Sequence, residues 1–106
     1  MAHDAPQKFH PAASAGSLAP GEGRSVDIGG RRFALFNLLG QFHAMDDSCP
    51  HRQAPLGAGF IEDTRVYCPM HGWCFEITTG ACVSNPERPV RTYPVRVENG
   101  EIEIYF

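Results

Sequence analysis

Frequent turn-forming residues are the feature that most limits how this chain can fold. Eleven glycines and nine prolines, together with Asn and Asp, divide the 106 residues into short segments in which apolar and polar side chains alternate. Such alternation is typical of half-buried β-strands, and no segment of useful length has the helical spacing of apolar side chains. The sequence therefore predicts an all-β fold, an antiparallel sandwich or small barrel.

Two β-hairpins can be placed from their turns, which consist of two residues that tolerate a positive φ. The predicted pairs are 25–28 with 31–38 across Gly29-Gly30, and 93–98 with 101–105 across Asn99-Gly100. In the second hairpin, Val95 and Val97 share a face opposite Ile102 and Ile104. The other predicted strands are 42–45, 65–68, and the pair 74–77 with 81–83 across Thr79-Gly80.

Length and composition indicate one ordinary domain. We expect a flexible N-terminus over residues 1–8 and one folded domain over residues 9–106. The net charge of −3 and the absence of a basic excess argue against a nucleic-acid partner. No stretch reaches the ~18 apolar residues that span a bilayer, and the opening residues lack a signal-peptide pattern. These features predict a cytoplasmic chain with no membrane partner.

Four residues with metal-binding side chains lie on two loops rich in Gly and Pro. Cys49 and His51 are followed, after the sixteen residues 52–67, by Cys68 and His71. Each loop can direct one thiolate and one imidazole to the same centre. Two sulfur and two nitrogen ligands suit a tetrahedral zinc ion or an iron–sulfur cluster in which two histidines replace two cysteines. The ligand types alone leave both alternatives open.

The motifs Cys49-Pro50-His51 and Cys68-Pro69-Met70-His71-Gly72-Trp73 resemble the signature of the Rieske [2Fe–2S] proteins. The resemblance extends from about Phe9 to Phe106. It implies an antiparallel β-sandwich or barrel with a cluster-binding subdomain of two loops, and one [2Fe–2S] cluster per chain. It further implies that Cys49 and Cys68 hold the buried iron, and that His51 and His71 hold the iron nearer the surface.

Departures from the high-potential members of this family indicate a low reduction potential. Those proteins carry a disulfide at positions matching Ala54 and Met70, and hydroxyl donors to the cluster sulfurs at positions matching Trp73 and Phe75. Hydrogen bonds to sulfur stabilise the reduced cluster, so their absence lowers the potential. We expect a value in the lower half of the family range of about −150 to +300 mV.

The resemblance also implies an electron carrier without a substrate site of its own. The chain ends before the mononuclear iron domain of a ring-hydroxylating oxygenase could begin, and no further catalytic motif is present. The expected partners are a flavin-dependent reductase that oxidises NAD(P)H and a terminal oxygenase. One alternative is the small subunit of an assimilatory nitrite reductase, bound to its large subunit. A zinc-stabilised binding module is the alternative from another class.

The surroundings of the predicted site give several smaller expectations. Arg52, Gln53 and Trp73 are the predicted rim of the docking surface over the histidines, and Trp73 is also expected to pack beneath its loop. The loop 84–89 resembles the segment that covers the cluster in the family, although a rigid connection predicts the same residues.

The remaining cysteines and histidines are expected to be structural. We expect Cys74 and Cys82 to be buried free thiols, with a cross-strand disulfide as the alternative. His3, His10 and His43 lie outside any ligand spacing and are expected to be surface or structural groups.

Overall fold

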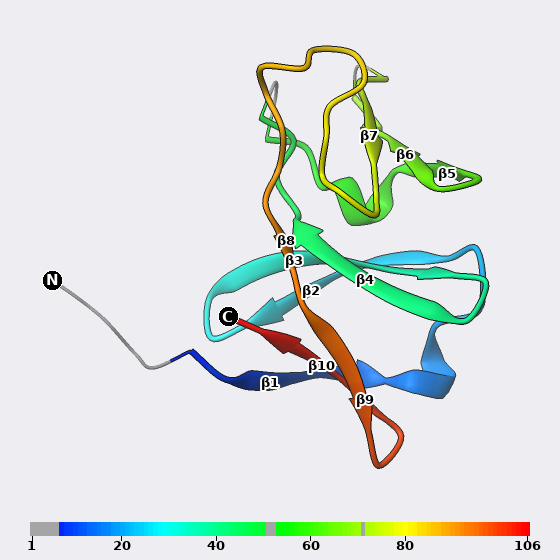
Figure 1. The fold of residues 1–106 in the computed structure, drawn as a ribbon, viewed down its shortest axis with the longest axis vertical. Coiled ribbons are helices and arrows are strands. Elements are labelled where there is room, and N and C mark those ends of the chain that lie inside the picture. Colours follow the sequence, from blue (N-terminus) through cyan, green and yellow to red (C-terminus); the bar gives the residue numbers. More distant parts are fainter. Residues whose placement is uncertain (1–6, 51–52, 71) are drawn as a thin grey trace, which may run out of the picture.

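A computed structural model describes residues 7–50, 53–70 and 72–106 (Figure 1). Its elements form three antiparallel sheets with the strand orders β1-β10-β9, β2-β3-β4-β8 and β5-β6-β7. The strands are β1 (Phe9–Ser14), β2 (Gly23–Ile28), β3 (Arg31–Leu38), β4 (Gln41–Asp46), β5 (Phe60–Glu62), β6 (Arg65–Tyr67), β7 (Cys74–Glu76), β8 (Thr92–Tyr93), β9 (Val95–Glu98) and β10 (Glu101–Tyr105). The 3-10 turns η1 (Ala15–Ser17) and η2 (Leu56–Ala58) are the helical elements of the described residues, which confirms the all-β prediction.

Strand β3 separates two hydrophobic cores. Its residues from Phe33 to Asn37 are all buried, and successive side chains of a strand point to opposite faces. Phe33 and Leu35 pack with Ile102 and Ile104 of β10, whereas Ala34 and Phe36 pack in the core beneath β5, β6 and β7. The sheet β2-β3-β4-β8 is therefore the middle layer of the molecule, as Figure 1 shows. Burial on both faces explains the continuous apolar run of β3.

Both predicted two-residue turns are confirmed. Gly29 and Gly30 have φ values of 60° and 90°, and Asn99 and Gly100 have values of 52° and 78°. The register pairs Ile28 with Arg31 in the first hairpin and Glu98 with Glu101 in the second. The predicted face of the second hairpin is also confirmed, because Val97 lies opposite Ile102 and Val95 opposite Ile104. Val97 is still 48% exposed, since β9 is an edge strand.

Two predicted strands need correction. Residues 93–98 do not form one strand: Tyr93 belongs to β8 and pairs with β4, and β9 begins only after Pro94. Proline has no backbone N–H with which to continue a ladder. Residues 81–83 form no strand either, since they meet β7 only through the bridge between Phe75 and Cys82. This bridge lies on the edge of β7 opposite to β6, and its two hydrogen bonds, from the Glu76 N–H to Ala81 O and from the Val83 N–H to Cys74 O, are too few to make a ladder.

The N-terminal strand β1 was not predicted, and nor was β5. β1 pairs with β10, with an irregularity between Pro11 and Ala13. Pairing continues to Lys8 and Phe106, which exchange two backbone hydrogen bonds of 3.1 Å. Residues 1–6 of the predicted flexible N-terminus lie outside the described residues. The described part of the chain contains no helix with the length and apolar character needed to cross a membrane.

Candidate metal centre

The two cysteines Cys49 and Cys68 open turns with the same backbone hydrogen bonds. We call residues 49–54 the first ligand loop and residues 68–73 the second ligand loop. In the first, the Cys49 N–H donates to Ala54 O at 2.9 Å and the Gln53 N–H donates to Cys49 O at 2.5 Å. In the second, the Cys68 N–H donates to Trp73 O at 2.7 Å and the Gly72 N–H donates to Cys68 O at 2.9 Å. The chain thus builds one turn twice.

The fifth residue of each turn has a left-handed backbone conformation. Gln53 has φ 58° and Gly72 has φ 73°. This region favours glycine, so the first ligand loop keeps a non-glycine residue at a conformational cost. The repeated turn explains why the two loops look alike in sequence, each with Cys followed by Pro and then by His.

Both cysteines lie in one core. Cys49 is fully buried, Cys68 is 3% exposed, and both belong to the same cluster as Leu56, Val66 and Phe75. Sulfur ligands buried among apolar side chains suit an iron–sulfur cluster, because a coordinated thiolate shares its charge with the metal. The burial of both cysteines in one apolar core therefore suits the iron–sulfur cluster predicted from the sequence.

The two predicted histidine ligands, His51 and His71, lie outside the described residues, as does Arg52. Within the described ranges, no group of three or more His, Cys, Asp or Glu side chains is arranged to hold a metal ion. The complete ligand set therefore stays a prediction.

Asp47 holds the base of the first ligand loop, a role that the sequence analysis did not find. Its Oδ1 accepts hydrogen bonds from Ser25 Oγ at 2.9 Å and from the Gly57 N–H at 2.8 Å, and its Oδ2 accepts one from Arg32 Nε at 3.3 Å. The Asp47 side chain is 4% exposed. A buried carboxylate is stable only when it is hydrogen-bonded in this way. In the sequence, Asp46 and Asp47 are adjacent at the end of a predicted strand, and nothing there indicates which of the two is buried.

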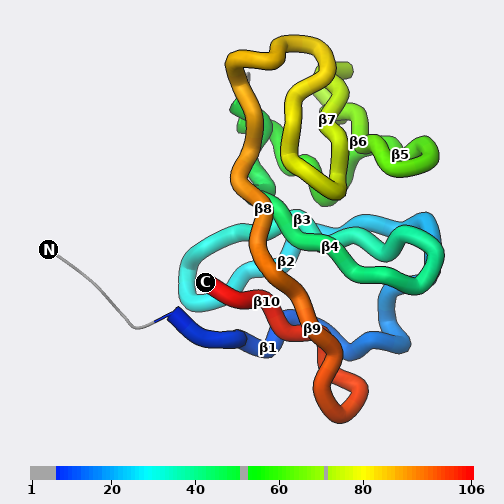
Figure 2. The backbone as a smooth tube through the Cα atoms, viewed as in Figure 1, coloured from blue at the N-terminus to red at the C-terminus, as the bar shows by residue number. Residues whose placement is uncertain are grey.

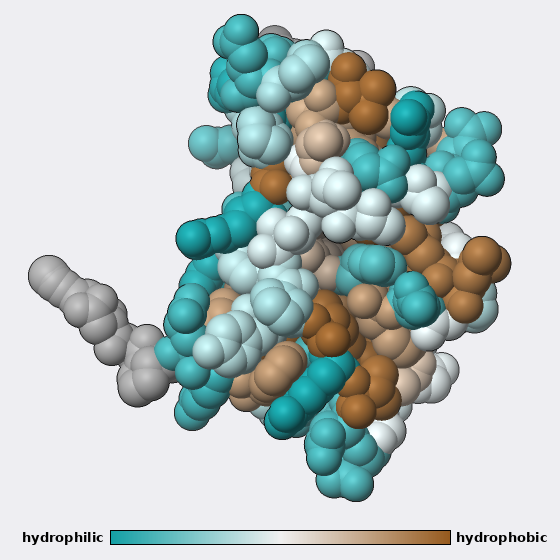
Figure 3. All heavy atoms as spheres, viewed as in Figure 1, coloured by the Kyte–Doolittle hydropathy of each residue, from teal (hydrophilic) through white to brown (hydrophobic). Residues whose placement is uncertain are grey.

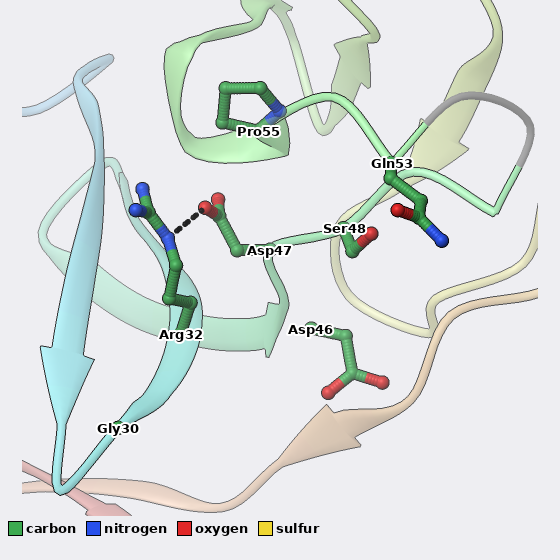
Figure 4. A pocket seen from close by; sticks show the side chains of 7 residues that line it. All are labelled: Gly30, Arg32, Asp46, Asp47, Ser48, Gln53 and Pro55. Carbon is green, nitrogen blue, oxygen red and sulfur yellow. Dashed lines mark hydrogen bonds and ion pairs between the residues drawn. The ribbon is translucent and has the colours of Figure 1, made fainter.

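A cavity of about 580 Å³ lies beside this anchor (Figure 4). It is lined by Gly30, Arg32, Asp46, Asp47, Ser48, Gln53 and Pro55. Figure 4 shows Arg32 and Asp47 joined on one side of it, with the side chain of Asp46 separate from that pair. The Tyr93 hydroxyl donates a hydrogen bond of 2.6 Å to Asp46. Burial, followed by this bond, raises the pKa of Tyr93.

Three described side chains lie in or directly after the second ligand loop. Trp73 packs against the core that contains both cysteines, in agreement with the packing role expected of it. Phe75 is fully buried in the same core. Met70 is 64% exposed. Neither Trp73 nor Phe75 has a hydroxyl group to offer a sulfur atom.

Cys74 and Cys82 are buried free thiols, as predicted. Cys82 lies opposite Phe75 in the register, and directly opposite residues share a face of a sheet. Cys74 therefore points to the other face, and this geometry excludes a disulfide between the two. The Tyr67 hydroxyl forms a hydrogen bond with Cys74, its cross-strand neighbour, and this bond is the main cause of the raised pKa of Tyr67.

The other histidines are structural where they are described. His10 stacks on Phe106 with ring centroids 3.8 Å apart. His43 is partly buried in β4, and this burial lowers its pKa. His3 lies outside the described residues. Both described histidines are partly buried residues of strands, in agreement with the predicted structural role.

Comparison with known proteins identifies a family. The family model for the Rieske [2Fe-2S] domain matches residues 8–94. The anthranilate 1,2-dioxygenase ferredoxin subunit of Burkholderia cepacia is 34% identical, covering 92% of this chain and 91% of its own length. The 4beta-methylsterol monooxygenase of Methylococcus capsulatus is 36% identical over 85% of this chain, which spans only 27% of that relative's length.

Two solved structures share the fold. A structure described as a complex of reduced oxygenase and oxidized ferredoxin in carbazole 1,9a-dioxygenase contains a chain with a TM-score of 0.82 and 31% identity, with 91% of each chain covered. A structure described as an NADH-dependent nitrite reductase small subunit from Mycobacterium tuberculosis has a TM-score of 0.87 and 29% identity, covering 96% of this chain and 97% of that chain. With the family-model match over most of its length, this chain belongs to the Rieske [2Fe–2S] domain family.

Proposed function

We propose that this chain is a one-electron carrier in which Cys49, His51, Cys68 and His71 bind a [2Fe–2S] cluster. The cluster supplies a single reversible redox step when bound. The observation that supports the proposal best is the duplicated turn, which begins at a buried cysteine in each of two loops that meet in one core. The cysteines would hold the inner iron and the histidines the outer one.

The partners we propose are a flavin-dependent reductase that oxidises NAD(P)H and a terminal oxygenase. The relative from Burkholderia cepacia, which this chain matches over nearly its whole length, is a ferredoxin subunit of a dioxygenase. The carbazole dioxygenase structure contains a ferredoxin in complex with an oxygenase. By analogy, this chain would accept one electron from its reductase and pass it to its oxygenase. The thiols of Cys74 and Cys82, which are not joined, agree with a cytoplasmic location.

The surface near the ligand loops suits brief contact with a partner. Gln53 and Met70 are exposed, and Trp73 is partly exposed. Figure 3 shows that apolar side chains on the face in view form small separate patches among polar ones. Electron-transfer partners typically bury little surface and dissociate readily. We therefore propose docking over the ligand loops.

We propose that the reduction potential lies in the lower half of the family range. Ala54 and Met70 cannot form a disulfide, and Trp73 and Phe75 cannot donate a hydroxyl hydrogen bond. With fewer donors to the sulfur atoms, the reduced state is less stabilised.

An anaerobic redox titration followed by electron paramagnetic resonance tests this proposal. We expect a red-brown protein whose reduced form has an average g value below that of all-cysteine clusters, with a midpoint in the lower half of the range of about −150 to +300 mV. Conversion of Cys49 or Cys68 to Ser should abolish the signal, whereas Cys82→Ser should retain it. A colourless zinc protein would contradict the carrier function.

The small subunit of a nitrite reductase is the second candidate, because the Mycobacterium tuberculosis structure has a TM-score of 0.87. The two candidates differ in how long the partner stays bound. Stable co-purification with a large reductase subunit would favour nitrite reduction. Weak, salt-sensitive binding to an oxygenase would favour the ferredoxin role.

A further inference from the structure

Arg88 connects the loop 84–89 to the first ligand loop. Its Nη2 donates a hydrogen bond of 2.9 Å to the carbonyl oxygen of Pro50. Pro50 lies directly between Cys49 and His51 in the sequence, so the bonded carbonyl belongs to the peptide that leads from one proposed ligand to the next. Figure 2 shows the yellow-to-orange segment after β7 arching over the end of the molecule that carries the ligand loops.

The loop that carries Arg88 is held by its own hydrogen bonds. The Arg88 N–H donates to Asn85 O at 2.9 Å, and the Asn85 N–H donates to Cys82 Sγ at 3.3 Å. One residue earlier, Ser84 Oγ accepts the Cys74 N–H at 2.9 Å. Both cysteines are buried, so the loop is anchored in the core. Its backbone therefore holds Arg88 within reach of Pro50.

The bond also places a permanent positive charge beside the first ligand loop. The guanidinium group of an arginine carries a positive charge. Reduction adds one negative charge to the loaded site, so a cation nearby stabilises the reduced form more than the oxidised form. The effect of Arg88 is moderated by solvent, because its side chain is exposed.

We propose that Arg88 is a positioning residue that holds the Pro50 peptide in place and raises the reduction potential of the holoprotein. This inference rests on the proposed function, since only a chain with a bound cluster has the potential in question. The inference also distinguishes the two interpretations of the loop 84–89, which either covers the cluster or is merely a rigid connection between strands. A rigid connection would need the two prolines but not the Arg88 side chain.

Three variants of the holoprotein test the proposal. Arg88→Met removes the charge and the donor but keeps an unbranched stem, and Arg88→Lys keeps the charge. Arg96→Met is the matched control, since Arg96 is an arginine of β9, in the sheet farthest from the ligand loops in Figure 1. Should Arg88→Met not fold, Arg88→Gln removes the same charge. The readouts are the midpoint potential and the rate at which an iron chelator bleaches the visible absorbance.

For Arg88→Met we expect the ratio of reduced to oxidised protein at the wild-type midpoint to fall about fivefold, which is about 40 mV for a one-electron couple. Bleaching should also be several-fold faster, whereas Arg88→Lys and Arg96→Met should keep the wild-type midpoint. Equal shifts in Arg88→Met and Arg88→Lys, or no difference between Arg88→Met and Arg96→Met, would overturn the proposal. A wild-type protein without a Rieske spectrum would instead overturn the proposed function.

Discussion

The two ligand loops share one turn but are held in different ways. The first ligand loop depends on residues distant in sequence: Asp47 binds Ser25 at its base, and Arg88 binds Pro50 at its tip. The second ligand loop is the connection between the neighbouring strands β6 and β7, and its hydrogen bond from Cys68 to Trp73 follows directly on their ladder. Turns with the same two backbone hydrogen bonds can thus be stabilised by tertiary contacts in one place and by a local hairpin in another.

The largest expected effect comes from the close contact at Gly57. A Cβ atom there would lie 2.5 Å from the Ser25 backbone nitrogen and 2.6 Å from the Arg24 carbonyl carbon. Because backbone cannot move aside as a side chain can, Gly57→Ala should lower the free energy of unfolding by about 3 kcal/mol or more. Urea denaturation measures this loss. Gly16→Ala is the control, since nothing lies within 4 Å of its added atom.

Asp47→Ala should have the next largest effect. It leaves the Ser25 hydroxyl and the buried Gly57 N–H without their acceptor, so we expect a loss of about 2–3 kcal/mol in the free energy of unfolding. Asp27 provides the matched control, because it accepts the Gly30 N–H at an exposed turn. Equal losses in the free energy of unfolding for Asp47→Ala and Asp27→Ala would show that the first ligand loop does not depend on its tertiary contacts through Asp47.

A smaller effect is expected at the left-handed residues of the two turns. Gly72→Ala should cost about 1 kcal/mol, since its added atom meets nothing and only the positive φ is unfavourable. Gln53→Gly should change the free energy of unfolding by about 0.5 kcal/mol or less, because relief of the backbone is offset by the flexibility of glycine in the unfolded chain. Thermal denaturation measures the stability of both variants. A larger loss of stability in Gln53→Gly than in Gly72→Ala would contradict the shared left-handed conformation.

The smallest effect concerns His43, which lies in the middle sheet and outside both loops. Burial lowers its pKa below the ordinary histidine value of 6.5, so the unfolded chain binds a proton first as the pH falls. Its contribution to stability is therefore complete above about pH 6.5 and decreases as the pH falls toward the folded pKa. Urea midpoints at pH 5 and pH 7.5 should differ less in His43→Gln than in the wild type. An unchanged difference would assign the pH dependence to other groups.

Local sequence determined the hairpins and the loop positions. Gly29-Gly30 and Asn99-Gly100 predict their turns because few other residue pairs adopt two successive positive φ values. The short spacing of Cys49 from His51 and of Cys68 from His71 marked the two ligand loops. Features of this kind depend on residues that are close together in the chain, so they can be found without the fold.

The tertiary structure decided which partners each strand and side chain has. Nothing near β1 indicated that it would pair with β10, and nothing near Pro94 indicated that Tyr93 would join β4. Likewise, the choice of Asp47 rather than Asp46 for burial depends on where Ser25 lies, 22 residues away. Pairing over such distances is set by how the whole chain packs, because many alternative partners have the same local preferences.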